Sequence, residues 1–326
     1  MKVRIASFNI YWFPSSPFIG NRRSKADLAK LREVIRRLDA DVLVFQEILD
    51  LAALEKLLSG LTPNRAYQLR DAAGSWIASG AAKKADMKVP LAFDSRTLEV
   101  LESGTARRAG DPPAAKGRRD PVAARLQPRG GGPAFTVIGV HLKSGILTEG
   151  PTPSTPDDEI RLEETARLAA WITQLSPLTP GGPQRPAGEP TVVIGDFNAV
   201  HGNVALKPFS AAGPLASWSW LAPRFTTKMI PSPAEAKLGP NDRWTTHLDR
   251  KVIDHIIVAP GTKVVDGPWV YAFDRDASWL KAVSVAGEWL EAQGCLLSPN
   301  NGAATKVENL HRISDHRPVW ANVALG

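Results

Sequence analysis

The segment Thr191–Ala199 reads TVVIGDFNA and joins a short apolar run to a cluster of polar side chains. The β-branched residues at 192–194 favour a buried strand. Asp196 and Asn198 follow directly, so a carboxylate and an amide lie where this strand ends. Rigid scaffolds commonly present binding and catalytic groups at such positions. The segment therefore predicts a functional site at the exit of a core strand.

Four other segments share this arrangement, in which a β-prone run ends in polar residues able to bind a cation or transfer a proton. They are Ser7–Asn9 (SFN), Phe45–Glu47 (FQE), Val140–Ser144 (VHLKS) and Ser314–Pro318 (SDHRP). A sixth segment, Ile253–Ile256, places Asp254 inside an apolar run, where an unpaired carboxylate is costly. We expect these segments to contribute to one site and Asp254 to have a polar partner.

Strand-like and helix-like segments alternate along the chain. The predicted strands are Val3–Ile10, Val42–Phe45, Phe135–Val140, Thr191–Ile194, Val252–Val258 and Pro318–Val323. Apolar residues at helical spacing after Ser24 and Asp27 predict a first helix that reaches Leu38. A second helix is predicted over Asp158–Gln174, where acidic residues at the start suit the helix dipole.

Two segments rich in Pro and Gly, Ala106–Pro133 and Ser176–Pro190, are predicted as loops. The first carries the basic residues Arg107, Arg108, Lys116, Arg118, Arg119, Arg125 and Arg129. Such a run most simply forms a solvated loop, and contact with nucleic acid is the alternative interpretation. The stretch Gly202–Trp244 is predicted to be irregular with short helices.

The composition indicates a globular, core-forming protein, since 43% of the 326 residues are apolar and 22% are charged. The single cysteine, Cys295, excludes an intramolecular disulfide and a thiolate zinc cluster. The net charge of +7 and the pI near 9.6 favour a polyanionic partner. Because no apolar run has the length of a signal peptide or a membrane span, we expect a soluble, cytoplasmic protein.

The six polar segments, taken in their order along the chain, resemble the motifs of the endonuclease/exonuclease/phosphatase superfamily, whose members include deoxyribonuclease I. The matching motifs extend from residue 7 to residue 318 and so cover nearly the whole chain. The resemblance implies a four-layer α/β/β/α sandwich of the α+β class. Two mostly antiparallel sheets would face each other with helices outside, in a single domain over residues 1–326.

The resemblance also implies a divalent cation, Mg²⁺ or Mn²⁺. A hard cation acts as a Lewis acid and neutralises charge when a phosphodiester is attacked. Oxygen ligands suit it, and only one or two protein carboxylates are needed. Glu47 is the first expected ligand, Asp315 is the second, and Asn9 lies close to the ion.

The remaining motif residues receive catalytic roles from the same resemblance. Asp196 would orient or deprotonate the attacking water, and Asn198 would hold a phosphate oxygen. His316, polarised by Asp254, would stabilise the phosphorane-like transition state or transfer a proton. His141 would contact a non-bridging oxygen from the other side.

The pattern departs from the superfamily at one point. In deoxyribonuclease-like members the first histidine is paired with a Glu, but between Arg70 and Ala92 only Asp71 and Asp86 are present. The acidic partner of His141 is therefore unassigned. The Tyr-containing motif of abasic-site endonucleases is also absent, which disfavours that subclass. His255 alternates to the opposite strand face from Asp254, so we expect it to be structural.

The leading functional prediction is metal-dependent hydrolysis of DNA by a deoxyribonuclease-like nuclease. The alternative keeps the site and changes the substrate to a phospholipid, sphingomyelin or an inositol phosphate. A third possibility, from another class, is an inactive binding scaffold, which complete retention of the motif residues disfavours. We expect a monomer that has nucleic acid as its partner and no stable membrane association.

Overall fold

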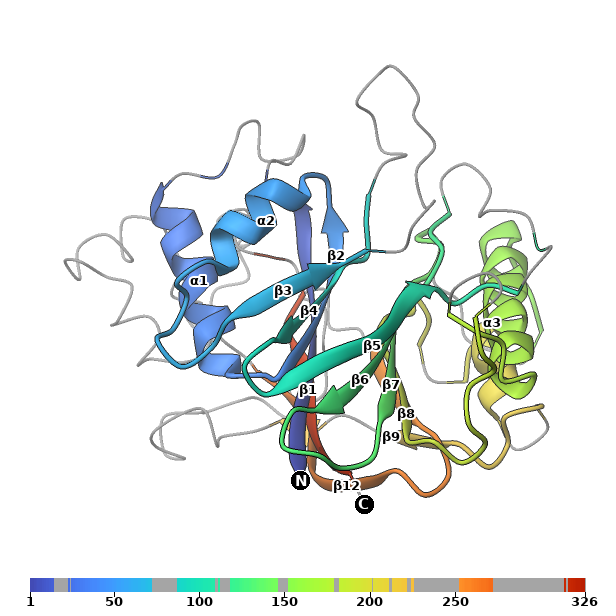
Figure 1. Ribbon diagram of the computed structural model, residues 1–326. Helices are drawn as coiled ribbons and strands as arrows, with labels where there is room; N and C mark the ends of the chain where they lie inside the picture. Colours follow the sequence, from blue (N-terminus) through green and yellow to red (C-terminus); the bar gives the residue numbers. More distant parts are fainter. Residues whose placement is uncertain are drawn as a thin grey trace.

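The computed structural model describes residues 1–14, 23, 25–71, 87–108, 111, 118–145, 152–178, 182–200, 202–210, 213–221, 224–225, 252–271, 314 and 316–325. Two β-sheets pack face to face, and helices lie on the outer side of each sheet (Figure 1). The predicted four-layer sandwich is therefore confirmed. No helix in these ranges is both long enough and apolar enough to cross a membrane.

The first sheet has the strand order β10-β12-β13-β1-β2-β4-β3. Its strands are β1 Lys2–Phe13, β2 Val42–Ile48, β3 Tyr67–Arg70, β4 Leu91–Asp94, β10 Arg224–Phe225, β12 Lys263–Val270 and β13 Val319–Ala324. The helices α1 (Lys25–Leu38) and α2 (Leu51–Leu58) cover its outer face. Leu31, Ile35 and Leu38 of α1 pack there against Phe8 and Phe45, so the apolar spacing read from the sequence is the buried stripe.

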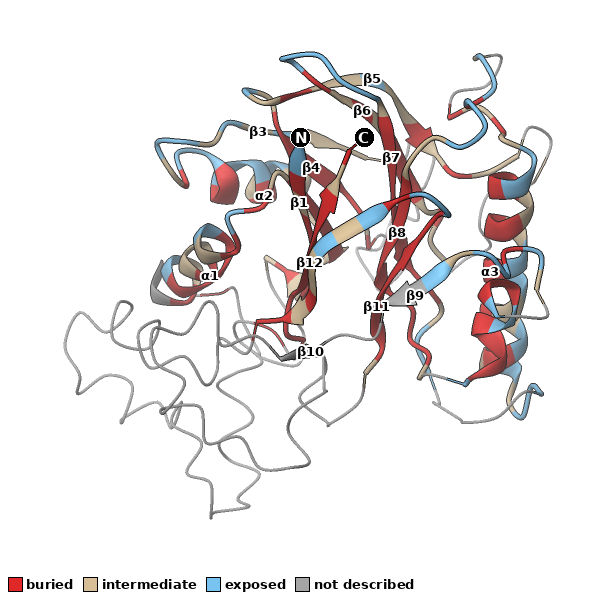
Figure 2. Cartoon of the chain, turned by 90° about the horizontal axis from the view of Figure 1, so that it is seen from below, coloured by how far each residue is buried: buried red, intermediate tan, exposed pale blue. Residues whose placement is uncertain are grey.

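The second sheet has the order β5-β6-β7-β8-β11-β9. Its strands are β5 Leu98–Thr105, β6 Val122–Pro128, β7 Phe135–His141, β8 Thr191–Asp196, β9 Ser219–Leu221 and β11 Asp254–Val258. Helix α3 (Pro156–Thr173) and the 3-10 helix η2 (Val204–Phe209) lie outside it. The facing sides of the two sheets share one apolar core, and Figure 2 shows these central strands as almost continuously buried.

Each sheet contains a central parallel pair, and these pairs position the polar motifs. In the first sheet β1 runs parallel to β2, with Asn9 opposite Gln46. In the second sheet β7 runs parallel to β8, with His141 opposite Asp196. Because the carboxyl ends of parallel strands lie at the same edge, the polar residues at the ends of these four strands gather together.

The predicted strands and the two predicted helices are present, but the prediction of a loop over Ala106–Pro133 is wrong. That range contains β6, which pairs with β5 and β7. The basic residue Arg125 is tolerated in this strand because it forms an ion pair of 2.6 Å with Glu189. The described parts of Ser176–Pro190 contain no helix or strand, as predicted. Within Gly202–Trp244, the described residues form η2, β9 and β10, and the remainder lies outside the described residues.

The junction between β8 and the polar cluster depends on a glycine. Gly195 has φ +150°, and an added Cβ would lie 2.1 Å from the backbone oxygen of Val140. Gly261 has φ +83°, with no atom within 4 Å of an added Cβ. An alanine at either position would have a strained backbone, but only an alanine at position 195 would also overlap a neighbouring strand.

We predict that Gly195→Ala lowers the free energy of unfolding by about 1–3 kcal/mol more than Gly261→Ala does, since only the first change forces two strands apart. Urea unfolding monitored by circular dichroism measures both values. Equal losses in the two variants would show that the close approach of β7 and β8 does not constrain position 195.

Candidate active site

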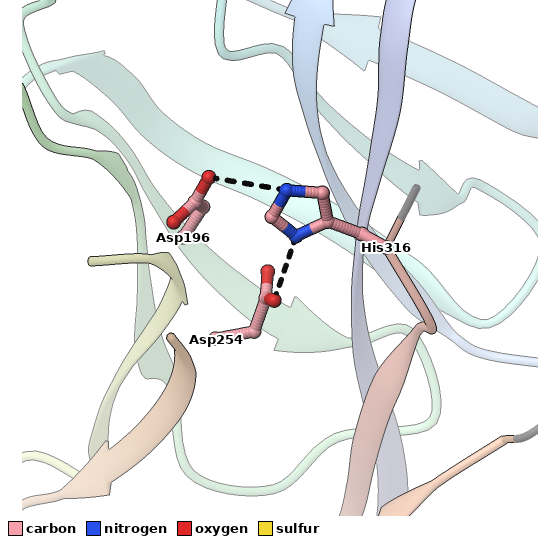
Figure 3. A group of neighbouring side chains, drawn as sticks. All are labelled: Asp196, Asp254 and His316. Atoms are coloured by element: carbon pink, nitrogen blue, oxygen red, sulfur yellow. Dashed lines mark hydrogen bonds and ion pairs between the residues drawn. The ribbon is translucent and has the colours of Figure 1, made fainter. Parts of the chain in front are cut away.

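Side chains from both sheets meet at one edge of the sandwich. Asp196 ends β8, Asp254 begins β11, and His316 lies three residues before β13. Figure 3 shows that both carboxylates point toward the imidazole ring. Asp254 lies directly opposite Asp196 in the antiparallel register of β8 and β11, which explains why two acids from distant parts of the sequence are neighbours.

His316 and Asp254 form a buried hydrogen-bonded dyad. The distance between His316 Nδ1 and Asp254 Oδ2 is 2.8 Å. The His316 backbone N–H donates to the Ser314 hydroxyl at 2.9 Å, and that hydroxyl donates to the Asn9 carbonyl at 2.5 Å. With Nδ1 engaged by a carboxylate, Nε2 is directed toward Asp196 Oδ2 at 3.7 Å.

The Asn9 amide connects the two sheets at the centre of the cluster. Its Nδ2 donates to Glu47 Oε1 at 3.2 Å and to Asp196 Oδ2 at 3.1 Å. The same nitrogen lies 3.4 Å from His316 Nε2. Carboxylate oxygens from β2 and β8 thus converge on one point, where the structure places a polar N–H group.

The end of the β1–β2 pair is distorted where Asn9 and Glu47 enter the site. Asn9 pairs with Gln46 and Phe13 with Ile48, so three residues of β1 lie opposite the single residue Glu47. Glu47 itself has φ +61°, a conformation that costs a non-glycine residue roughly 1–2 kcal/mol. Such strain persists where surrounding contacts enforce it, commonly at functional sites.

Asp196 is held firmly and is almost completely buried, with 1% of its surface exposed. Its Oδ1 accepts the backbone N–H of Asn198 at 2.8 Å, which leaves Oδ2 facing the cluster. Burial raises the pKa of Asp196 to about 7; the charges of Asp254 and Glu47 add to this rise, and His316 opposes it. The Asn198 side chain donates to the Leu142 carbonyl at 3.1 Å and joins this loop to the end of β7.

His141 lies on the opposite side of Asp196 from the dyad. Its Nε2 is 3.5 Å from Asp196 Oδ2 and 3.9 Å from Glu47 Oε1. Neither ring nitrogen has a hydrogen-bond partner among the described residues. Burial holds the pKa of His141 well below its usual value, and the positive charges of Arg119 and His316 lower it further. The imidazole is therefore neutral at physiological pH.

Between Arg70 and Ala92, the described residues supply no acidic partner for His141. Asp71 forms an ion pair of 3.1 Å with Lys88. Asp86 lies outside the described residues, as do the predicted metal ligand Asp315 and the histidines His201, His247 and His311. His255 lies apart from the cluster, with Nε2 2.7 Å from the Ala199 carbonyl and its ring edge-on to Phe197.

Arg119, in the segment before β6, is a charged residue of this site that the sequence did not single out. Its Nη1 is buried without a hydrogen-bond partner among the described residues, and its Nη2 donates to Met87 Sδ at 3.3 Å. Its charge interacts with Glu47 and Asp196. Other arginines of the same basic run are paired with acids: Arg107 with Asp120, Arg108 with Asp111, Arg118 with Glu163, and Arg125 with Glu189.

Helix α3 fixes the backbone that follows His141. Glu164 Oε2 accepts the N–H of Lys143 at 2.9 Å, and Arg161 Nη1 donates to the carbonyl of Lys143 at 3.1 Å. Burial raises the pKa of Glu164 to about 7. Neither residue carried a recognisable sequence signal, because the contact joins a helix face to a loop about twenty residues earlier along the chain, a separation set by the fold.

The oxygen-rich part of the cluster fits a hard divalent cation. Atoms of Asp196, Asp254 and His316 lie within 4.8 Å of one another and form one possible ligand group. The short hydrogen bond between Asp254 and His316 already engages two of these residues. Glu47 and Asp196 instead direct one oxygen each at Asn9 Nδ2, and carboxylate oxygens are ligands that Mg²⁺ prefers. Glu47 is thus compatible with the predicted metal position, whereas Asn9 turns its N–H group toward the two carboxylates and its Oδ1 toward the Tyr11 N–H.

Comparison with known proteins defines the class to which this fold and site belong. Residues 6–316 match the model of the Endonuclease/Exonuclease/phosphatase family, a family of hydrolases. The chain belongs to this family. No curated protein matched the chain.

Solved structures share the fold at low sequence identity. The human nocturnin catalytic domain with bound sulfate anion is 16% identical, with a TM-score of 0.61, and the match covers 100% of this chain and 95% of that one. TDP2 from D. rerio, complexed with single-strand DNA product, is 14% identical, with a TM-score of 0.56 and 99% coverage of both chains. A mannosyl-6-phosphatase from Bacteroides thetaiotaomicron is 15% identical, with a TM-score of 0.55 and 99% coverage of both chains.

The raised pKa of Asp196 predicts a pH-dependent stability of the metal-free protein. Between about pH 4 and pH 7 the folded state retains a proton that the unfolded state has lost, so this residue lowers the free energy of unfolding as pH rises through that window. Asp196→Asn removes the effect, which amounts to at most about 1.4 kcal/mol per pH unit. Urea unfolding in EDTA at several pH values measures the difference from wild type.

Glu55→Gln is the matched control, because Glu55 is an exposed acid on α2. This control should keep the wild-type dependence on pH. An Asp196→Asn protein with the same slope as wild type would contradict the assignment of a proton to Asp196 near neutrality.

Proposed function

We propose that the chain is a divalent-metal-dependent phosphodiester hydrolase, a deoxyribonuclease-like nuclease that acts on DNA within one domain over residues 1–326. One observation carries the proposal. Asp196 Oδ2 lies 3.1 Å from Asn9 Nδ2, 3.5 Å from His141 Nε2 and 3.7 Å from His316 Nε2. A carboxylate surrounded in this way has the groups that phosphoester hydrolysis needs, a base together with donors for a developing anion.

Asp196 is the base in this mechanism. A pKa of about 7 allows it to accept a proton from the attacking water at neutral pH while remaining partly ionised. The N–H of Asn198 holds Oδ1, so Oδ2 is the oxygen that faces the water. The Asn198 amide has a second N–H, beyond the one that donates to Leu142, with which to hold a phosphate oxygen.

The two histidines approach the phosphoryl group from either side. Asp254 engages Nδ1 of His316 and so orients the ring. Nε2 of His316 is then the nitrogen that donates a proton or a hydrogen bond to the negative charge developing on the phosphoryl oxygens or on the leaving group. His141 stays neutral and contacts a non-bridging oxygen. Arg119 adds positive charge on the His141 side, where it offsets the charge of the phosphate.

Glu47 and Asn9, together with Asp315, would hold Mg²⁺ or Mn²⁺. When bound, the cation supplies Lewis-acid polarisation and neutralises phosphate charge. The distorted end of the β1–β2 pair keeps Glu47 directed into the site, because the Trp12 N–H donates to Glu47 Oε2 at 3.2 Å. The chain's own contribution is therefore a fixed oxygen ligand rather than a mobile one.

The choice of DNA rests on charge and on the paired histidines. The net charge of +7 favours a polyanion, and Arg119, whose Nη1 has no hydrogen-bond partner among the described residues, places part of that charge beside the site. The shared fold with TDP2 bound to a DNA product is consistent with this choice, and the shared fold with a mannosyl-6-phosphatase makes sugar phosphates the next substrates to test. We propose that the protein acts as a monomer.

We predict that wild-type protein nicks supercoiled plasmid with Mg²⁺ or Mn²⁺ and not with EDTA. Asp196→Ala and Glu47→Gln should each lower the rate by at least about 10³-fold, because the first removes the base and the second a metal ligand. Glu55→Gln, which changes an exposed acid on α2, should retain full activity. Rates are measured from the loss of supercoiled DNA on gels, with circular dichroism as the folding control.

A fully active Asp196→Ala protein would contradict the mechanism. A folded wild-type protein that nicks no DNA with any metal would contradict the choice of substrate. Lipid and inositol phosphodiesters and sugar phosphates would then be assayed with the same variants.

A further inference from the structure

Three residues of β1 form a bulge beside the proposed metal ligand. Ile10, Tyr11 and Trp12 lie opposite the single residue Glu47 of β2, between the pairs Asn9–Gln46 and Phe13–Ile48. We call Ile10–Trp12 the aromatic bulge. The bulge is part of the active-site wall, because the residue before it and the residue opposite it are the two groups proposed to hold the cation.

The conformation of the aromatic bulge is unusual for its residues. Tyr11 has φ +41° and Trp12 has φ +55°, both in the left-handed region. That region is uncommon for residues other than glycine, and two bulky aromatic residues in succession are far from its usual occupants. A conformation of this kind persists only when neighbouring groups enforce it.

Neighbouring groups hold the backbone of the bulge from both sides. On the site side, the Tyr11 N–H donates to Asn9 Oδ1 at 3.0 Å and the Trp12 N–H donates to Glu47 Oε2. On the other side, Arg23 Nη2 donates to the carbonyls of Ile10 and Tyr11, each at 2.7 Å. Arg23 is itself buried, so this anchor is rigid. The aromatic side chains are therefore carried on a fixed backbone.

The bulge contains one core side chain and two that are partly exposed. Ile10 is fully buried in the core between the first sheet and its helices. Tyr11 and Trp12 are only half-buried, although their backbone lies next to the polar cluster. Partly exposed aromatic side chains can bind nucleobases by stacking, which accepts any base because every base has a π face.

We propose that Tyr11 and Trp12 form a stacking platform for an unpaired nucleobase next to the scissile phosphate. This inference rests on the proposed function and specifies its substrate class. In a duplex the faces of the bases are covered by their neighbours, so a platform of this kind selects single-stranded or locally opened DNA. This role would explain the strained backbone of the bulge, because the strained conformation fixes where the two rings begin relative to Glu47.

The test compares two single-stranded oligonucleotides of equal length, one with bases and one built of abasic sites. Fluorescence anisotropy with Mg²⁺ measures the Kd of both for the full chain carrying Asp196→Asn, which prevents cleavage. Phosphate contacts are the same in both oligonucleotides, so the ratio of the two Kd values isolates the contribution of the bases. We expect the oligonucleotide with bases to bind about 5- to 150-fold more tightly.

Two double variants in the same background separate ring stacking from other roles. Tyr11→Leu with Trp12→Leu keeps apolar bulk and removes both rings, and it should bring the ratio close to 1. Tyr11→Phe with Trp12→Phe keeps both rings and should retain most of the discrimination. A purely structural role would alter the folding of the Leu variant without changing the ratio of the two Kd values.

The outcomes distinguish this inference from the proposed function. A ratio near 1 for the parent protein overturns the platform, whether or not the Leu variant folds. A ratio that is the same in the Leu and Phe variants also overturns it, even if the wild-type enzyme cleaves DNA. If the ratio falls only in the Leu variant while the wild type cleaves no DNA, the platform stands and the assignment of DNA as the hydrolysed substrate fails. Failure to bind either oligonucleotide overturns the platform, and the plasmid assay then decides the proposed function by itself.

Discussion

The register of three strands in the second sheet is the constraint on which the site depends. Asp196 lies opposite His141 in the parallel pair with β7 and opposite Asp254 in the antiparallel pair with β11. A shift of one residue in either pair would turn one of these side chains to the other face of the sheet. The close approach of Gly195 to Val140 holds this register next to the row formed by His141, Asp196 and Asp254.

This row places two carboxylates close together out of water, an arrangement that is costly without compensation. Compensation comes from the first sheet, since the Asn9 amide donates to Asp196 and the His316 ring bonds to Asp254. The remaining cost appears in the raised pKa of Asp196, which is the property that suits it to accept a proton at neutral pH. Face-to-face packing of the sheets therefore joins the stability of the fold to the chemistry of the site.

The sequence predicted those parts of the molecule that local patterns encode. β-branched runs that end in acids, amides or histidines identified the polar residues of β1, β2, β7 and β8 and the start of β11. Helical spacing identified α1, and the acidic residues at its start identified α3. β6 was predicted to be a loop because its segment is rich in Pro, Gly and basic residues. Its Arg125 has a partner 64 positions away, Glu189, that no local pattern reveals. Family membership agrees with the resemblance that the motifs indicated.

Other features of the site could not be predicted, because they depend on contacts between distant segments. Arg119 differs from Arg107, Arg108, Arg118 and Arg125 in having a buried guanidinium nitrogen without a hydrogen-bond partner among the described residues, and its own sequence context does not show this. The left-handed conformations of Tyr11 and Trp12 run against the preferences of both residues. They arise from hydrogen bonds to Asn9, Glu47 and Arg23, and such contacts exist only once the sheets and helices are assembled.

The central claim is that Glu47 and Asn9 bind a divalent cation next to Asp196. Anomalous diffraction at the manganese edge, from crystals grown with Mn²⁺, tests this claim most directly. The predicted result is an anomalous peak in contact with the Glu47 carboxylate and beside Asp196, with the hydrogen bond between Asp254 and His316 intact. A peak bound by Asp254 and His316 in place of that hydrogen bond, or no peak at Glu47, would contradict the claim.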